Sequence, residues 1–248
     1  MLAKEITSLQ HPIVKHLVQL RQSRELRRSS KTALAVGKKM VADLAKSLPL
    51  IELFFTEENT DLPLHAETKY LVTTDILKKI TGLQHPDGVA AVVPLPLEQD
   101  LSRKNYLLLL NGVQDPGNVG ALFRSALGLG WEGIFLTPGT ADPCNDKALR
   151  AAKGATFHLP FSYASEEEVI LLTQEKKIPA YVACAGGKEV ETLGFQPPLL
   201  LVLGSEGSGP SFTFLKTSTK IALPMAPSIE SYNVAAAGSM LMYAMRKK

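Results

Sequence analysis

The chain has 248 residues, a length that fits one large domain or two modest ones. Hydrophobic residues make up 45% of it and charged residues 21%, close to globular averages, which argues against disordered, collagen-like and coiled-coil classes. No apolar run approaches the roughly 18 to 20 residues that span a bilayer, and the first residues lack the apolar segment of a secretory signal. We therefore expect a soluble, cytoplasmic protein without membrane contact.

Basic residues are concentrated near the N-terminus. Residues 1–48 hold ten of the 27 Lys and Arg but only three of the 24 Asp and Glu, a net charge of +7, which leaves −4 for the rest. Such a segment indicates a polyanionic partner, although a merely solvated basic face is the commoner reading when nothing else points to nucleic acid. The candidate phosphate contacts are Arg21, Arg24 and Arg28. The two cysteines, with no CxxC spacing, predict reduced thiols and no metal site.

Strand and helix signals alternate through the first part of the chain. The spacing of Ile13, Leu17 and Leu20 predicts a helix over residues 10–20 with a basic continuation. Strands are expected at 34–36, 50–55, 70–73 and 89–93, and helices at 39–46 and 75–79. The proline and charge content of residues 94–100 is typical of a linker. We therefore expect a small α/β domain over residues 1–97, a linker over 98–104 and a second domain over 105–248.

The second domain begins with a continuous apolar run at residues 106–110. Such a run predicts a strand buried on both faces, and hence a mostly parallel sheet covered by helices. Further strands are expected at 134–136, 180–183, 199–203 and 221–223, with helices at 118–129, 146–152, 166–176 and 234–246, and His158 is expected on an edge strand. The fold class is α/β, and ligands of such sheets bind at the carboxyl ends of the strands.

Three polar loops follow buried strands in this second domain. The loop at 111–124 is rich in glycine and opens a helix, as anion sites do, but it lacks GxGxxG and GK[ST]. Arg124 is interpreted as a phosphate clamp or, alternatively, as a surface arginine. In the loop at 203–210 three glycines free the backbone around the carboxylate of Glu206. In the loop at 223–234, Ser231 and Asn233 are either site residues or helix caps.

Together the three loops resemble, in order and spacing, the signature motifs of the SpoU (TrmH-like) RNA ribose 2'-O-methyltransferases. The motifs that carry the resemblance are Asn118-x-Gly120-x-x-x-Arg124, Gly204-x-Glu206-Gly207-x-Gly209, and Leu223-Pro224-Met225 with Ser231-Tyr232-Asn233-Val234. Upstream, residues 6–15 and 85–89 are similar to the N-terminal RNA-substrate-binding domain of many members. The specific motifs lie in the last 145 residues or so.

The resemblance implies a catalytic domain of the SPOUT type, with a trefoil knot that holds S-adenosyl-methionine, acting on RNA as a homodimer. It implies a catalytic pocket lined by Asn118, Arg124, Glu206 and Asn233. It implies a cofactor site formed by Leu203, Gly204, Leu223, Met225, Ser231, Tyr232, Asn233 and Val234. Ribosomal RNA is favoured over transfer RNA, because the two-domain form resembles that subgroup. Since a guanidinium is a poor proton acceptor, we expect Arg124 to clamp and to stabilise an alkoxide.

Two other functions remain open from the sequence. One is a catalytically inactive RNA-binding or ribosome-assembly factor. The other is a nucleotide-binding oxidoreductase, which the missing GxGxxG makes remote. Three positions depart from the family pattern: Val36 stands where an acidic residue commonly precedes the glycine, and Pro210 and Tyr232 each stand where leucine is usual.

Overall fold

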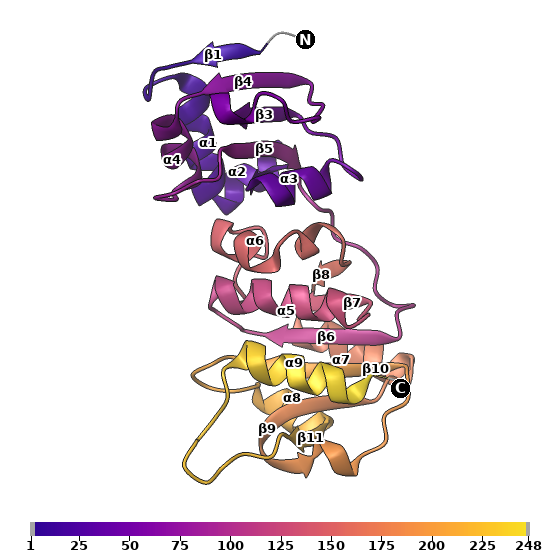
Figure 1. Cartoon of the computed structure of the whole chain (residues 1–248). Helices are drawn as coiled ribbons and strands as arrows, with labels where there is room; N and C mark the ends of the chain where they lie inside the picture. Colours follow the sequence, from indigo (N-terminus) through magenta and orange to yellow (C-terminus); the bar gives the residue numbers. More distant parts are fainter. Residues whose placement is uncertain (1–2, 247–248) are drawn as a thin grey trace. The chain divides into compact units, whose positions relative to one another are not determined.

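The computed structural model describes residues 3–246, which divide into two compact units (Figure 1). The first unit comprises residues up to Pro96 together with Cys144–Arg150, and the second comprises Leu97–Pro143 and the residues from Ala151 onward. Within the described residues, no helix has the length and apolar character needed to cross a bilayer.

The first unit is a five-stranded sheet with helices. Its order is β1-β4-β3-β5-β2, in which β1, β4 and β3 run parallel while β5 is antiparallel to both β3 and β2. Its core contains Leu17 and Leu20, two of the residues whose spacing predicted the first helix. The elements are β1 (Lys4–Ile6), α1 (Pro12–Gln22), α2 (Arg24–Ser30), β2 (Thr32–Val36), α3 (Lys38–Leu44), β3 (Glu52–Phe55), η1 (Glu57–Asn59), β4 (Thr68–Val72), α4 (Thr74–Thr81) and β5 (Val89–Pro94).

The second unit is built on a six-stranded sheet in which every neighbouring pair is parallel. The order is β11-β9-β10-β6-β7-β8. The elements are β6 (Tyr106–Asn111), α5 (Pro116–Gly128), β7 (Gly133–Leu136), α6 (Asp146–Ala152), η2 (Ala155–Phe157), β8 (Phe161–Tyr163), α7 (Glu166–Glu175), β9 (Ala180–Glu189), η3 (Val190–Thr192), β10 (Leu199–Gly204), α8 (Phe212–Thr217), β11 (Thr219–Ala222) and α9 (Val234–Met245).

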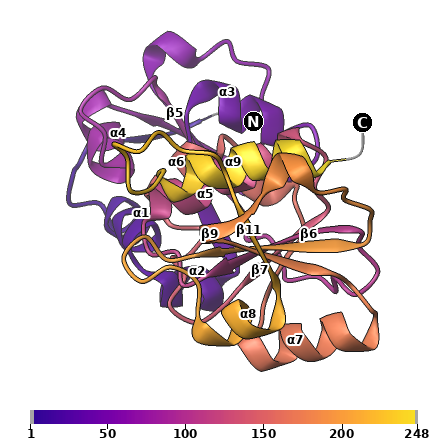
Figure 2. The ribbon, with the colours of Figure 1, turned by 90° about the horizontal axis from the view of Figure 1, so that it is seen from below.

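Helices cover both faces of this sheet, with α5 and α9 on one side and α7 and α8 on the other (Figure 2). Alternate residues of the central strands serve the two layers: Leu108 and Leu201 pack toward α5 and α9, whereas Leu107 and Leu200 belong to the core beneath α7 and α8. The parallel pairing of β6 with β10 and β7 confirms the predicted parallel sheet, and β6 is buried from its second residue onward because helices cover both of its faces.

Several local predictions need correction. His158 was expected on an edge strand, but it caps η2 instead, because Gly154 turns the chain in the left-handed region (φ 91°) just before. The strand expected at 180–183 extends to Glu189. Residues 98–104 belong to the second unit, in which the Gln99 amide donates to the Phe161 carbonyl (2.9 Å) and Leu101 is buried.

One arginine of the basic N-terminal segment has a structural role. Arg27 is 3% exposed, and its Nη1 donates to the carbonyl oxygens of Leu20 (2.9 Å) and Arg21 (2.8 Å). These carbonyls belong to the last turn of α1, where helix carbonyls lack partners within the helix. The Arg27 side chain therefore caps α1 and is not part of the exposed basic surface.

We expect Arg27→Leu to lower the free energy of unfolding by about 1–3 kcal/mol, because it leaves two helix carbonyls without their donor. Urea unfolding followed by circular dichroism measures this loss. Arg28→Leu is the matched control, since Arg28 lies next to Arg27 on α2 but is exposed. It should change the free energy of unfolding by less than about 0.5 kcal/mol. Equal midpoints for the two variants would contradict the capping role.

Candidate active site

Three loops meet at the carboxyl end of the second unit's sheet. Asn118 lies in the first turn of α5, which follows β6, and Glu206 lies just after β10. Asn233 is the N-cap of α9, which follows β11. Because β6 and β10 are paired in parallel, the loops after them leave the sheet at the same edge.

The side chains of these three residues are joined in a chain of hydrogen bonds. Asn118 Nδ2 donates to Glu206 Oε1 over 2.8 Å, and Asn233 Nδ2 donates to Asn118 Oδ1 over 3.1 Å. The Gln114 amide donates to the second carboxylate oxygen, Oε2, at 3.4 Å. Asn118 is thus the link between a glutamate 88 residues away and an asparagine 115 residues away.

Helix caps fix the direction of this chain. Asn233 Oδ1 accepts the backbone amides of Ala235 (2.9 Å) and Ala236 (3.3 Å), so its Nδ2 faces Asn118. Asp115 caps α5 by accepting the Asn118 amide at 2.9 Å. Every donor along the path therefore points toward Glu206, the terminal acceptor.

The loop that carries Glu206 is closed on itself. The backbone amides of Ser205 and Gly209 each donate to the other's carbonyl, at 3.1 and 3.0 Å, and the Ser208 amide donates to Ser205 Oγ at 3.2 Å. The loop folds back over Gly204, where an added Cβ would overlap the backbone of Gly209 and Pro210. The glycine is required because the returning chain occupies the space that a side chain would need.

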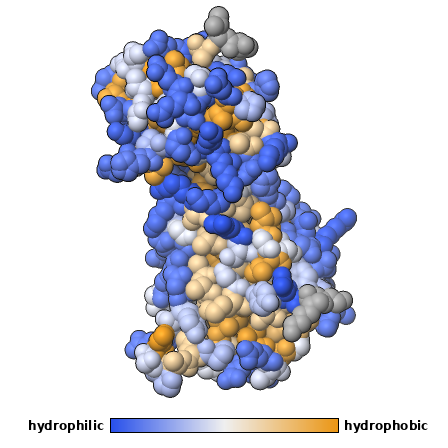
Figure 3. Space-filling model, viewed as in Figure 1, coloured by the Kyte–Doolittle hydropathy of each residue, from blue (hydrophilic) through white to orange (hydrophobic). Residues whose placement is uncertain are grey.

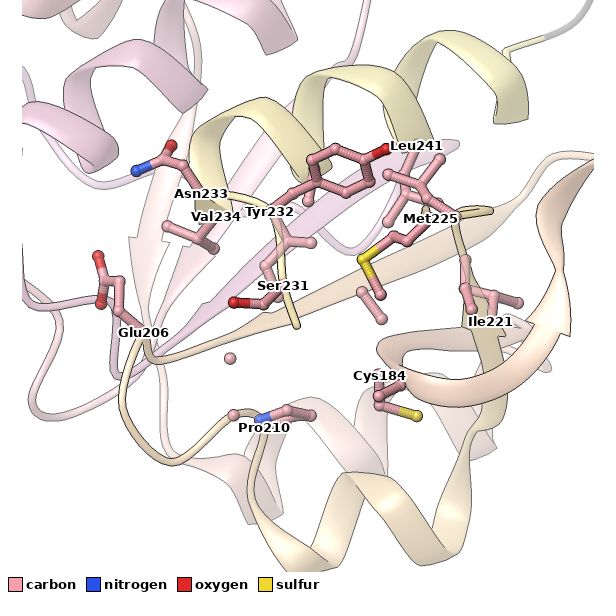
Figure 4. Close-up of a pocket in the computed structure, with 18 of the residues that line it drawn as sticks. Cys184, Glu206, Pro210, Ile221, Met225, Ser231, Tyr232, Asn233, Val234 and Leu241 are labelled. Atoms are coloured by element: carbon pink, nitrogen blue, oxygen red, sulfur yellow. The ribbon is translucent and has the colours of Figure 1, made fainter. Parts of the chain in front are cut away.

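A cavity of about 480 Å³ adjoins this network (Figure 4). All eight residues expected to hold the cofactor line it: Leu203, Gly204, Leu223, Met225, Ser231, Tyr232, Asn233 and Val234. Glu206 and Asn233 lie together at one end, with Cys184 and Ile221 across the cavity (Figure 4). The structure thus brings residues from β9, β10, β11 and α9 around one space.

Sequence reasoning missed part of the cavity wall. Cys184 and its alanine neighbours enter from the middle of β9, and Glu230 adds a second carboxylate. These β9 residues were missed because the strand was expected to end at residue 183, and because small side chains such as alanine belong to no recognisable motif. Burial raises the pKa of the Cys184 thiol, and nearby Lys220 lowers it by a smaller amount. The thiol is therefore neutral at physiological pH.

Two of the three departures from the family pattern, Pro210 and Tyr232, lie in this wall. Pro210 lines the cavity beside Gly204. The Tyr232 hydroxyl donates to the Pro224 carbonyl at 3.2 Å, which closes the base of the loop between these two residues. Neither departure removes a member of the hydrogen-bonded chain. Val36, the third departure, ends β2 in the first unit.

Arg124 lies outside the cavity wall. It is exposed on α5 and lines a broad neighbouring depression of about 1400 Å³ with Tyr243 and Met240 of α9. Leu223 and Tyr232 line both spaces, so the depression and the cavity share a wall. Of the four expected catalytic residues, three are joined by hydrogen bonds and the fourth faces the adjoining compartment.

The three arginines expected to contact phosphate differ in their surroundings. Arg24 and Arg28 are exposed on α2 and share a face of it, because they are four residues apart. Arg21 is partly buried, and its Nη1 lies 3.4 Å from Asp146 Oδ2. No group of three or more His, Cys, Asp or Glu side chains within residues 3–246 is placed to hold a metal ion.

Comparison with known proteins extends the sequence resemblance. The chain is 30% identical to the 23S rRNA (guanosine(2553)-2'-O)-methyltransferase RlmP of Bacillus subtilis, over 98% of this chain and 99% of that protein. The AdoMet-bound rRNA methyltransferase from Sinorhizobium meliloti has a TM-score of 0.87 at 24% identity, covering 98% of this chain and 97% of that one. A putative RNA methyltransferase of the TrmH family from Porphyromonas gingivalis has a TM-score of 0.83 at 28% identity, covering 96% and 98%.

The family model for the "SpoU rRNA Methylase family" matches residues 105–243, more than half of the chain. This range contains Asn118, Glu206 and Asn233, the residues that the hydrogen bonds join, together with the whole cavity wall. The chain therefore belongs to the SpoU rRNA methylase family.

Proposed function

We propose that the chain is an S-adenosyl-methionine-dependent enzyme that methylates the 2'-hydroxyl of a ribose in structured RNA, with ribosomal RNA as its substrate. The observation that carries this proposal is the hydrogen-bonded chain Asn233–Asn118–Glu206 at the end of a ligand-sized cavity. The Bacillus subtilis relative, named as a 23S rRNA 2'-O-methyltransferase, aligns with nearly the whole of this chain, which favours ribosomal over transfer RNA.

The cavity fits the cofactor in size and chemistry. Its volume lies in the range of small-molecule sites, which are about 300–1,000 Å³. Leu203, Ile221 and Leu241 give an apolar wall that suits a flat adenine ring. Glu206 and Glu230 supply carboxylates that suit the cationic sulfonium and ammonium groups. When bound, the cofactor supplies an electrophilic methyl group on sulfur.

In the proposed mechanism the chain's own residues position charge. Asn118 and Asn233 hold the Glu206 carboxylate at one end of the cavity, where it is the anionic member of the expected catalytic set. From the neighbouring compartment, the Arg124 guanidinium binds an RNA phosphate and stabilises the developing 2'-oxyanion through its N–H donors. The hydroxyl proton leaves to Glu206, water or the RNA phosphate. Positioning of the two reactants supplies most of the acceleration.

We expect Arg124→Ala to slow single-turnover methylation by about 100-fold or more, because a donor to the developing charge is lost. Arg124→Lys should recover part of the rate across pH. Calorimetric affinity for S-adenosyl-methionine should not change, since Arg124 lies outside the cavity wall. The substrates are 23S rRNA and tRNA from cells that lack the gene.

The control for this experiment is Arg103→Ala, which removes an exposed arginine just before β6, at the opposite end of that strand from the site. A near-normal rate for Arg124→Ala would eliminate its essential role. Methylation confined to tRNA would overturn the ribosomal assignment. A wild-type chain that neither binds the cofactor nor changes the mass of RNA would favour an inactive RNA-binding or assembly factor.

We further propose a division of labour along the chain, with residues 1–97 as the RNA-substrate-binding domain, 98–104 as the linker and 105–248 as the catalytic domain. The excess of basic residues in the first 48 positions supports this assignment. Arg24 and Arg28 are the better candidates for phosphate contact because they are exposed, whereas Arg21 is partly buried. We propose a cytoplasmic location, because that is where bacterial ribosomal RNA is modified.

We expect the double variant Arg24→Gln with Arg28→Gln to bind RNA with a log affinity against log salt slope that is shallower by about 2, since each phosphate contact releases about one counterion. Filter binding over a salt series measures the slope. Lys176→Gln with Lys177→Gln removes two exposed charges from the second unit and should leave the slope unchanged. Identical slopes for both double variants would refute the assignment.

We also propose a homodimer formed through α5 and α9. Tyr243 is 59% exposed, and Met240 and Leu127 are 39% exposed on these helices. Hydrophobic residues gather on this face of the second unit (Figure 3). The hydroxyls of Ser125 and Ser239 are hydrogen-bonded at 2.7 Å, which holds the two helices as one surface. A trefoil knot is part of this proposal. After β11, which is at the edge of the sheet, the chain returns as α9 and packs on α5 and β10. On this path α9 contacts η3, which lies in the connection between β9 and β10.

We expect Tyr243→Glu to shift the protein toward a monomer in analytical ultracentrifugation, because it places a charge on the apolar surface of α9. Leu171→Glu is the matched control, since Leu171 is 55% exposed on α7, which covers the opposite face of the sheet. A monomeric wild-type protein, or equal effects of both variants, would contradict the proposed interface.

A further inference from the structure

A second hydrogen-bonded cluster lies next to the Glu206 loop and has no part in the mechanism above. Glu166, the first residue of α7, accepts Asn111 Nδ2 on one carboxylate oxygen and the Ser211 hydroxyl on the other, both over 2.7 Å. The Ser211 amide in turn donates to Asn111 Oδ1, also over 2.7 Å. The three residues form a closed ring that joins the end of β6 and the N-cap of α8 to the start of α7.

Two members of this ring are fixed by their own surroundings. Asn111 is 7% exposed at the end of β6, and the next amide, that of Gly112, donates to the hydroxyls of Thr137 and Thr140 at 3.1 Å each. Glu166 begins a helix whose start is closed by a reciprocal pair of bonds between Ser165 and Glu168. The hydrogen-bond partners of Ser211, Asn111 and Glu166, are thus both held in place.

Ser211 anchors the C-terminal end of the loop that carries Glu206. That loop is internally closed between Ser205 and Gly209, so it moves as one piece. One end continues from β10 at Gly204, and the other is held where Ser211 bonds Asn111 and Glu166. With the second attachment gone, the loop would pivot about its connection to β10, and Glu206 would lose its fixed place against Asn118.

We propose that Glu166 is a positioning residue for ribose methylation, acting through Ser211 and Asn111 to hold the Glu206 loop against Asn118. The inference rests on the proposed function. Glu166 does not line the cavity, so it has no direct contact with the cofactor site. The ring uses both carboxylate oxygens as acceptors, one for the Asn111 amide and one for the Ser211 hydroxyl. A glutamine has only one acceptor oxygen, so it keeps the second bond only if the Ser211 hydroxyl turns to accept instead of donate.

The test compares Glu166→Gln with Glu167→Gln. Glu167 is exposed in the same first turn of α7, so both variants remove the same charge at the same helix terminus. We expect Glu166→Gln, and likewise Ser211→Ala, to lower the single-turnover rate by roughly tenfold, the effect of one lost charged hydrogen bond. Glu167→Gln should stay within twofold of wild type.

A double-mutant cycle separates positioning from general stability. In a Glu206→Gln background, Glu166→Gln should lower the rate by less than about twofold, because its effect passes through Glu206. An undiminished effect in that background, or a Glu166→Gln rate equal to that of Glu167→Gln, would overturn the proposal.

A third measurement does not depend on activity. Hydrogen exchange of the amides at residues 205–211 should be faster in Glu166→Gln than in Glu167→Gln, because the anchorage of the loop is weakened. If the wild-type chain transfers no methyl group, the proposed function fails, and this comparison still decides whether Glu166 holds the loop. Equal exchange in the two variants would overturn the proposal.

Discussion

The site depends on the side-chain amide of Asn118, because it accepts a hydrogen bond from Asn233 in one loop and donates one to Glu206 in another. A primary amide has a donor end and an acceptor end, so its orientation is set once Asn233 donates to its oxygen. The nitrogen is then aimed at Glu206. Asn233 is oriented in the same way by the amides of α9 that it caps. Two helix starts, one of them 88 residues away in the sequence, thereby determine where the Glu206 carboxylate is held.

Much of this arrangement follows from the residues themselves. The apolar runs of β6 and β10 are typical of buried strands, and polar groups that follow neighbouring parallel strands lie at one end of the sheet. For that reason the eight expected cofactor residues all line one cavity. The motif resemblance added what periodicity could not supply, namely the identity of the ligand and the reaction.

What sequence reasoning missed shares a physical cause. Short elements such as β1, β8, α2 and α8 carry too few residues for a periodic signal, and they form because a neighbouring strand or helix is already in place. Glu166 was visible only as a residue in a helix start, since its two partners come from positions 45 and 55 residues away. Arg124 lines the depression beside the cavity, a placement that depends on how α5 packs and that its motif does not specify. Arg27 counted as positive charge and turned out to be a buried cap.

The wall shared by the cavity and the depression has a consequence for ligand design. At Leu223 and Tyr232 the two compartments are separated by side chains that line both. A bisubstrate ligand would place a nucleoside group in the cavity and an anionic group beside Arg124. The linker between the two groups would need to be only long enough to pass the ring of Tyr232. Joining the halves would turn the second encounter into an intramolecular event, so that two weak fragments combine into one tight inhibitor.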